Sequence, residues 1–143
     1  MRALICMIAL VVAVNIPSFG VDLFPIRIET FNYPLLGVQA QITGDVVVDV
    51  SIKRSGEVVQ TTLSSGNRVL ADAAESALMK WRFAYRCPDP DEPEVTVVRF
   101  YFTFKLEGVV DYRPRTRVTY TFPDQVTVIG EAVRVQPATR TNK

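Results

Sequence analysis

The fold of this chain is decided by residues 64–83, which read SSGNRVLADAAESALMKWRF. Gly66 and Asn67 interrupt a preceding β-pattern, and Ser or Asn side chains at such a turn accept hydrogen bonds from the free N–H groups of a first helical turn. The apolar residues that follow recur at spacings of three and four, so they share one face of a helix. They are Leu70, Ala74, Ala77, Leu78 and Trp81. Near the predicted end of the helix, where cations interact favourably with the helix dipole, stand Lys80, Arg82 and Arg86.

Alternating residues before and after this amphipathic helix predict the strands on which it packs. Residues 45–53 alternate between two faces, Ser55-Gly56 supplies the residues of a tight turn, and residues 57–63 return with β-branched side chains. Residues 95–106 have the strongest strand pattern, and we expect their row of phenylalanines to meet Trp81 and the alanines of the helix. The predicted fold class is α+β, a small antiparallel sheet (β-β-α-β) with one helix packed on one face, plus extra C-terminal strands.

Two further segments flank this unit. Residues 21–32 form an N-terminal arm, in which Leu23–Ile28 could add an edge strand or dock as an extended chain. Residues 107–143 form a C-terminal extension, in which residues 117–122 and 125–135 have strand character and the last residues look frayed.

The N-terminus, residues 1–20, has the pattern of a secretory signal peptide. Arg2 precedes an apolar run over residues 3–14, and small residues stand at Ser18 and Gly20. A bilayer span takes about 20 apolar residues, so this run is short for a permanent anchor. Cleavage near Gly20 predicts a periplasmic or secreted domain, and an uncleaved N-terminus anchored in the inner membrane is the alternative.

Charge and residue content argue against several classes of function. The chain has 16 basic and 15 acidic residues, and loss of Arg2 with the leader leaves no net charge, which gives no support to nucleic-acid binding. The sequence has no His, which removes Ser–His and Cys–His dyads and His-based metal sites. No residue is identified as a general base that could activate the Cys87 thiol. The acidic Pro-rich loop after Cys87 does not have the ligand spacing of a calcium-binding loop. We expect no enzyme activity, metal, cofactor or small-molecule substrate.

The helical stretch resembles the C-terminal domain of TonB, the energy transducer of Gram-negative bacteria. In that family a Ser-Ser-Gly-Asn turn leads into a helix with Leu, paired Ala and a closing Trp-Arg-Phe or Trp-Arg-Tyr. The resemblance covers about residues 33–106, from an opening Tyr-Pro, through a Gly before the first strand and a Ser-Gly-Glu-Val hairpin, to Phe-Thr-Phe-Lys-Leu in the last strand. The matching positions are Tyr33, Pro34, Gly44, Gly56, Ser65, Gly66, Asn67, Leu70, Trp81, Arg82 and Phe83.

The resemblance implies a protein-binding role in energy-coupled transport across the cell envelope. In the TonB family the partner is a short segment near the N-terminus of an outer-membrane receptor, which adds as a strand beside the last strand of the sheet. An unpaired sheet edge offers a row of N–H and C=O groups for such β-augmentation. An ordinary solvated strand face is the alternative interpretation of the outward positions of residues 95–106. These positions are Val95, Val97, Arg99, Tyr101, Thr103 and Lys105.

Two departures from the family leave a second function open. TonB proteins have a long Pro-rich spacer, whereas about a dozen residues separate Gly20 from Tyr33 here, at most roughly 40 Å when extended. This favours the fold and a binding role over energy transduction. In addition, the strands at 117–122 or 125–135 could cap the edge at 95–106 or drive a homodimer by strand exchange. The alternative function is a self-associating structural envelope domain whose sheet edge is occupied by its own tail.

Overall fold

The computed structural model describes residues 23–86, 90–91, 93–110, 113–121 and 123–134. The predicted signal peptide and Cys87 lie outside these residues. No helix within them is long and apolar enough to cross a membrane. The described elements are, in chain order, β1 (Leu23–Arg27), α1 (Leu35–Gln39), β2 (Gly44–Lys53), β3 (Val58–Ser65), α2 (Arg68–Leu78), β4 (Arg82–Tyr85), β5 (Val95–Val110), β6 (Thr116–Thr121) and β7 (Gln125–Val133).

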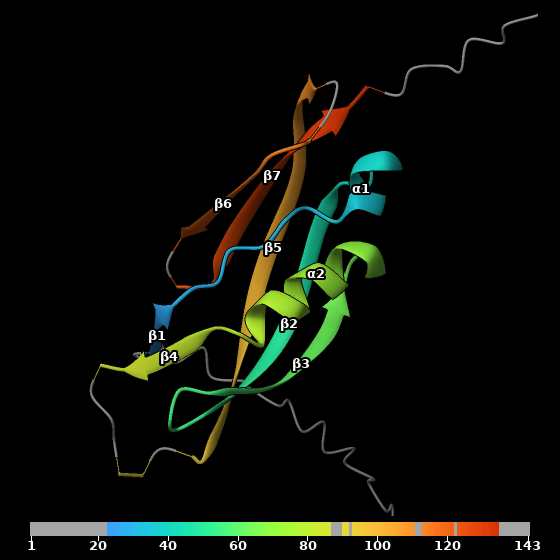
Figure 1. Cartoon of the computed structure of the whole chain (residues 1–143). Helices are drawn as coiled ribbons and strands as arrows, with labels where there is room; N and C mark the ends of the chain where they lie inside the picture. Colours follow the sequence, from blue (N-terminus) through green and yellow to red (C-terminus); the bar gives the residue numbers. More distant parts are fainter. Residues whose placement is uncertain (1–22, 87–89, 92, 111–112, 122, 135–143) are drawn as a thin grey trace, which may run out of the picture.

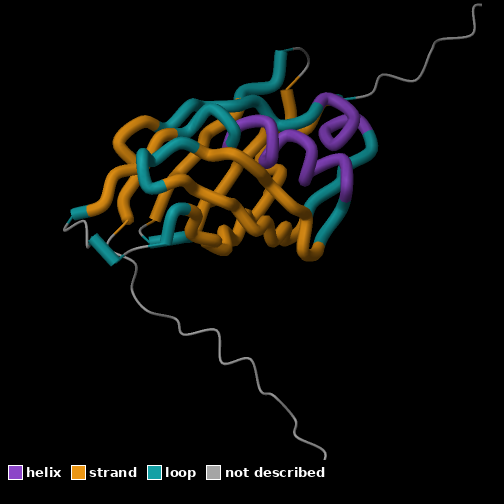
Figure 2. The backbone as a smooth tube through the Cα atoms, turned by 90° about the horizontal axis from the view of Figure 1, so that it is seen from below, coloured by secondary structure: helices purple, strands orange, loops and turns teal. Residues whose placement is uncertain are grey.

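Five strands form one sheet in the order β3-β2-β5-β7-β6 (Figure 1). Neighbouring strands are antiparallel except β5 and β7, which are parallel. β1 and β4 form a separate two-stranded antiparallel sheet, and both helices lie on one side of the larger sheet (Figures 1 and 2). The predicted α+β class, with a helix on one face and extra C-terminal strands, is confirmed. The sheet is larger and mixed because both tail strands join it and β7 runs parallel to its neighbour.

α2 begins where the turn residues predict. Asn67 is its N-cap, and the Asn67 Oδ1 accepts a hydrogen bond of 2.9 Å from the Val69 N–H. Gly66, just before it, has a φ of +116°, and a Cβ there would stand 2.6 Å from the carbonyl oxygen of Asp45. Only glycine meets both conditions, so the turn can bring the helix back close against β2.

The predicted helical face, by contrast, extends beyond the real end of α2. The helix ends at Leu78, and the N–H groups of Lys80 and Trp81 each bond at 3.0 Å to the carbonyl three residues earlier, which closes the last turn tightly. Trp81 is therefore outside the helix, and β4 follows it at once. The physical reason lies in Phe83, which is buried and donates its N–H to the carbonyl of Gly56 at 2.9 Å. A continuing helix would have neither contact.

The core lies between the large sheet and the layer of helices, β1 and β4. Trp81 packs edge-on against Phe100 with 6.0 Å between ring centroids, which confirms the predicted contact with the phenylalanine row. The largest fully buried side chains come from β2, α2, β5 and β7 and from Trp81 itself. They are Trp81, Phe100, Phe102, Phe104, Ile52, Leu70, Leu78, Val46, Val48, Val50, Val126 and Val128.

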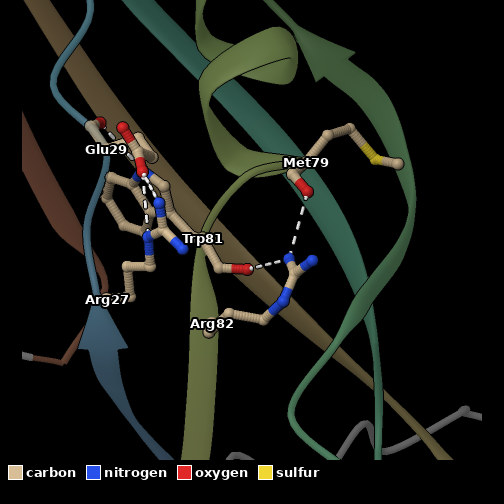
Figure 3. Close-up of polar contacts among 5 residues, drawn as sticks. All are labelled: Arg27, Glu29, Met79, Trp81 and Arg82. Carbon is tan, nitrogen blue, oxygen red and sulfur yellow. Dashed lines mark hydrogen bonds and ion pairs between the residues drawn. The ribbon is translucent and has the colours of Figure 1, made fainter.

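The N-terminal arm is fastened along the helix side of the molecule. β1 pairs with β4, so the strand expected near residues 23–28 forms in a small sheet of its own. The Trp81 indole N–H then donates to the Glu29 carbonyl at 3.1 Å, next to an ion pair between Arg27 and Glu29 (Figure 3). Phe31 follows and packs against Phe102 with 6.2 Å between ring centroids. The rest of the arm is therefore docked as an extended chain.

Both predicted tail strands form, over residues 116–121 and 125–133. β7 lies between β5 and β6, and the side chains of Val126 and Val128 are buried in the core. The extension is thus part of the same core as the strands before it.

Candidate functional site

The six positions predicted to receive a partner alternate along β5 and face away from the helices. Val97 lies opposite Ser51 of β2, and Arg99 lies opposite Asp49, while the phenylalanines between them turn into the core. Val97 is 64% exposed and Tyr101 is 45% exposed. The full set is Val95, Val97, Arg99, Tyr101, Thr103 and Lys105, and their side chains form one stripe of the uncovered sheet face.

The backbone edge of β5 that faces β7 is divided into two halves, because β7 covers only part of it. β7 pairs with β5 from Tyr101 to Val110, and the Tyr101 N–H donates to the Asp124 carbonyl at 2.9 Å. Because backbone groups of a strand point alternately to either side, those of Thr103 and Lys105 also point to β7. The second half of the predicted edge is therefore occupied by the chain's own tail.

The first half of the edge is open in the described part of the chain. The Glu94 carbonyl points to the β2 side of β5, where it accepts the N–H of Arg54, the residue just after β2, at 2.9 Å. The backbone groups of Val95 and of every second residue after it therefore point to the opposite side. Val95, Val97 and Arg99 thus direct their N–H and C=O groups to the side of β5 on which β7 lies. They precede Tyr101, the first residue of β5 that pairs with β7, so β7 does not cover them. This open segment, Val95–Phe100, is about 20 Å long at the usual rise of a strand.

Polar contacts hold the open segment in place on both faces. The Arg99 guanidinium bonds both Asp49 carboxylate oxygens, at 2.7 and 3.0 Å, and this hydrogen bonding lowers the pKa of Asp49 below its usual value, although partial burial acts in the opposite direction. On the helix side, the hydroxyls of Tyr85 and Thr96 lie 2.9 Å apart. The segment is therefore a fixed strand, ready to pair without a large ordering cost.

Tyr33, the first motif residue, connects the early part of the chain to the tail. Its N–H donates to the Thr116 hydroxyl of β6 at 2.8 Å, and its ring lies 5.4 Å from that of Phe104 and directly over Gly130 of β7. A Cβ at Gly130 would stand 2.7 Å from the Tyr33 ring, so that glycine is needed for the close packing. No local signal in the sequence pairs Gly130 with a tyrosine 97 positions earlier.

Most other motif residues build the frame of the site. Gly56 has a φ of +87°, and a Cβ there would stand 1.8 Å from the Phe83 carbonyl oxygen, so the hairpin turn packs directly on β4. Arg82 donates to the Trp81 and Met79 carbonyls at 2.8 and 3.4 Å, just beyond the end of α2 (Figure 3). Among the described residues, no group of three or more His, Cys, Asp or Glu side chains could hold a metal ion.

The sequence of the chain matches a known protein family. The family model described as the Gram-negative bacterial TonB protein C-terminal matches residues 29–106, which is more than half of the chain. The chain belongs to the TonB C-terminal family. The family segment begins in the docked arm and ends within β5, so β6 and β7 lie beyond it.

The chain is similar to the solution NMR structure of the Pseudomonas aeruginosa TonB C-terminal domain, with 24% sequence identity and a TM-score of 0.47 over 60% of this chain and 88% of that chain. No curated protein matches the chain.

Proposed function

We propose that this chain is a non-catalytic protein-binding module of the cell envelope, which takes an extended segment of a partner protein as an added strand along Val95–Phe100. The observation that supports the proposal is the set of unpaired backbone groups of Val95, Val97 and Arg99 on an otherwise paired strand. Such groups provide affinity for any extended chain, and the exposed side chains beside them provide selectivity. The family suggests an N-terminal segment of an outer-membrane receptor as the partner. The signal-peptide pattern of residues 1–20 suggests a periplasmic location after cleavage near Gly20.

The open segment limits how the partner can bind. Three residues with outward N–H and C=O groups accommodate a strand of about five to six residues. The partner cannot continue past Tyr101 in the same plane, because β7 begins there. A short segment beside the exposed Val97 is therefore the expected ligand, with an apolar residue at the position that contacts this side chain.

Amide exchange with a proline variant tests the proposal. Synthetic peptides from the N-termini of outer-membrane receptors should slow hydrogen–deuterium exchange at Val95, Val97 and Arg99. Val97→Pro removes an N–H that points away from β2, so the ladder to β2 stays intact while peptide affinity falls by about 2- to 10-fold or more. Val97→Thr keeps the N–H and serves as the matched control. Equal binding by Val97→Pro and the parent would contradict strand addition at this segment.

A second candidate is a self-associating structural domain, and the occupation of the β5 edge by β7 favours it. On this alternative no peptide protects Val95–Phe100, and the chain instead forms oligomers as its concentration rises. Peptide-dependent protection of Val95–Phe100 separates the two candidates, and sedimentation of the mature chain across a range of concentrations measures its self-association. A monomer at all concentrations with peptide-dependent protection would exclude the structural role.

A further inference from the structure

The two outer edges of the large sheet, within the residues that the structure describes, differ in regularity. The register between β2 and β3 shifts twice, between Val47 and Val48 and between Ser51 and Ile52, and each shift leaves one extra residue on β3. Such bulges twist an edge and protect it from pairing with another chain. β6 pairs with β7 over six residues without a shift, and it contains no proline. β6 is therefore a regular edge without these protective features.

The backbone direction of β6 follows from one hydrogen bond at its start. The Arg115 carbonyl accepts the Glu131 N–H of the β7 strand at 3.2 Å, so Arg115 and the alternate residues after it point to β7. Thr116, Val118 and Tyr120 then present their N–H and C=O groups on the outer side of the sheet. Figure 1 shows β6 as the outermost strand on this side.

We propose that a second copy of this chain pairs antiparallel with β6, with the two-fold axis at Val118, to give a continuous sheet of ten strands. Two identical strands bond only where outward backbone groups meet outward groups. Centring the pair on Val118 aligns all three outward residues of each copy, Thr116 with the partner's Tyr120 and Val118 with the partner's Val118. Every other antiparallel register aligns fewer of them, so this one forms the most hydrogen bonds.

The side chains of this register are compatible with the pairing. On the uncovered face, Arg117 of each copy lies opposite the partner's Thr119 and not opposite another arginine, and Arg117 already has Glu107 at 3.7 Å. On the helix face, the Tyr120 ring is held 5.9 Å from that of Trp81 and its hydroxyl bonds the Pro123 carbonyl. β6 is thus fixed before a second copy arrives, which reduces the cost of association.

Charge substitutions at Thr119 test this register, because its side chain is exposed. Thr119→Glu places a carboxylate opposite the partner's Arg117 at two symmetric positions, and we expect the dimer dissociation constant to fall by about 2- to 30-fold. Thr119→Lys places like charges there and should raise it by a similar factor. Analytical ultracentrifugation measures both constants, and thermal unfolding of each variant at low concentration checks that the fold is unchanged.

Two outcomes would overturn the proposal. A monomer at millimolar concentration excludes the dimer. Weaker association by both variants excludes this register and points to a pair centred on Thr119, in which residue 119 of each copy lies opposite residue 119 of the partner. In that pair either variant would place like charges opposite each other. Hydrogen–deuterium exchange provides the independent readout: protection of Thr116, Val118 and Tyr120 should rise with protein concentration. The proposal does not depend on the proposed function, since peptide binding is read at Val95, Val97 and Arg99 instead.

Discussion

Replacement of Gly56 by alanine tests the claim that the hairpin turn and β4 are packed against each other. Gly56 combines a φ of +87° with a Cβ direction that ends 1.8 Å from the Phe83 carbonyl oxygen. Gly108 offers a matched control, because it has a similar φ of +72° but nothing within 4 Å of its Cβ position. The two substitutions therefore share the backbone strain of alanine in the left-handed region and differ in the steric clash.

The magnitudes follow from these two terms. Alanine at a left-handed position costs about 1–2 kcal/mol, and Gly108→Ala should lower the free energy of unfolding by this amount alone. In Gly56→Ala the Phe83 carbonyl must also move by roughly 1 Å, since real Cβ contacts under 3.0 Å essentially do not occur. The shift weakens the hydrogen bond from the Phe83 N–H to the Gly56 carbonyl, about 1 kcal/mol, and part of the burial of the Phe83 ring, about 1.5–3 kcal/mol when complete. We expect a total of about 3–5 kcal/mol.

Urea denaturation followed by tryptophan fluorescence measures both variants, because Trp81 is the single tryptophan and lies in the core beside Phe83. The free energy of unfolding of each variant is compared with that of the parent at the same pH and salt concentration. Equal losses in Gly56→Ala and Gly108→Ala would show that backbone strain alone matters at Gly56, and would refute the close packing of the hairpin on β4.

Three further substitutions test other contacts. Trp81→Phe keeps an aromatic ring but leaves the Glu29 carbonyl without its N–H donor, so we expect a loss of about 1–3 kcal/mol in urea denaturation and faster amide exchange in β1. Asp49→Asn breaks the ion pair with Arg99. Folding lowers the pKa of Asp49, so the ion pair stabilises the folded state at pH values above the usual carboxyl pKa. The difference in free energy of unfolding between this variant and the parent should therefore narrow as the pH falls below about 4. Burial, together with the nearby Asp124 carboxylate, raises the pKa of Tyr120 to about 12. This group therefore contributes stability that is lost as the pH rises from about 10 to 12. In Tyr120→Phe the free energy of unfolding should fall less steeply over this pH range.

Periodicity in the sequence was sufficient for most elements of the fold. The alternation of residues 95–106 and the spacing of Leu70, Ala74 and Leu78 depend only on local geometry, so the faces of β5 and α2 could be predicted. The end of α2 could not, because Trp81 continues the helical spacing and β4 is only four residues long. Its strand conformation depends on Gly56 and β1, which are far away in the sequence.

The candidate site was predicted less completely than the fold, for a related reason. The side-chain stripe of β5 follows from its alternation, but its backbone edge depends on which strand lies beside it. Two strands could be predicted in the tail, yet nothing in their residues fixes a parallel register that begins at Tyr101. The division of the edge into an open and an occupied half is a property of strand order, and strand order is set by contacts such as that of Tyr33 with Gly130.

The same contacts decide how the role of the tail should be tested. Deletion of the residues after 108 would remove β6 and β7 and free the whole β5 edge, but it would also expose the Tyr33 ring, now 5% exposed, and the Phe104 ring, now 1% exposed. Increased association of such a truncated chain would follow from its uncovered core, whether or not the tail regulates binding. Point substitutions at Val97 and Thr119 leave that core intact, and each acts on one edge. They can therefore separate peptide addition at β5 from pairing of two copies at β6, which a truncation cannot do.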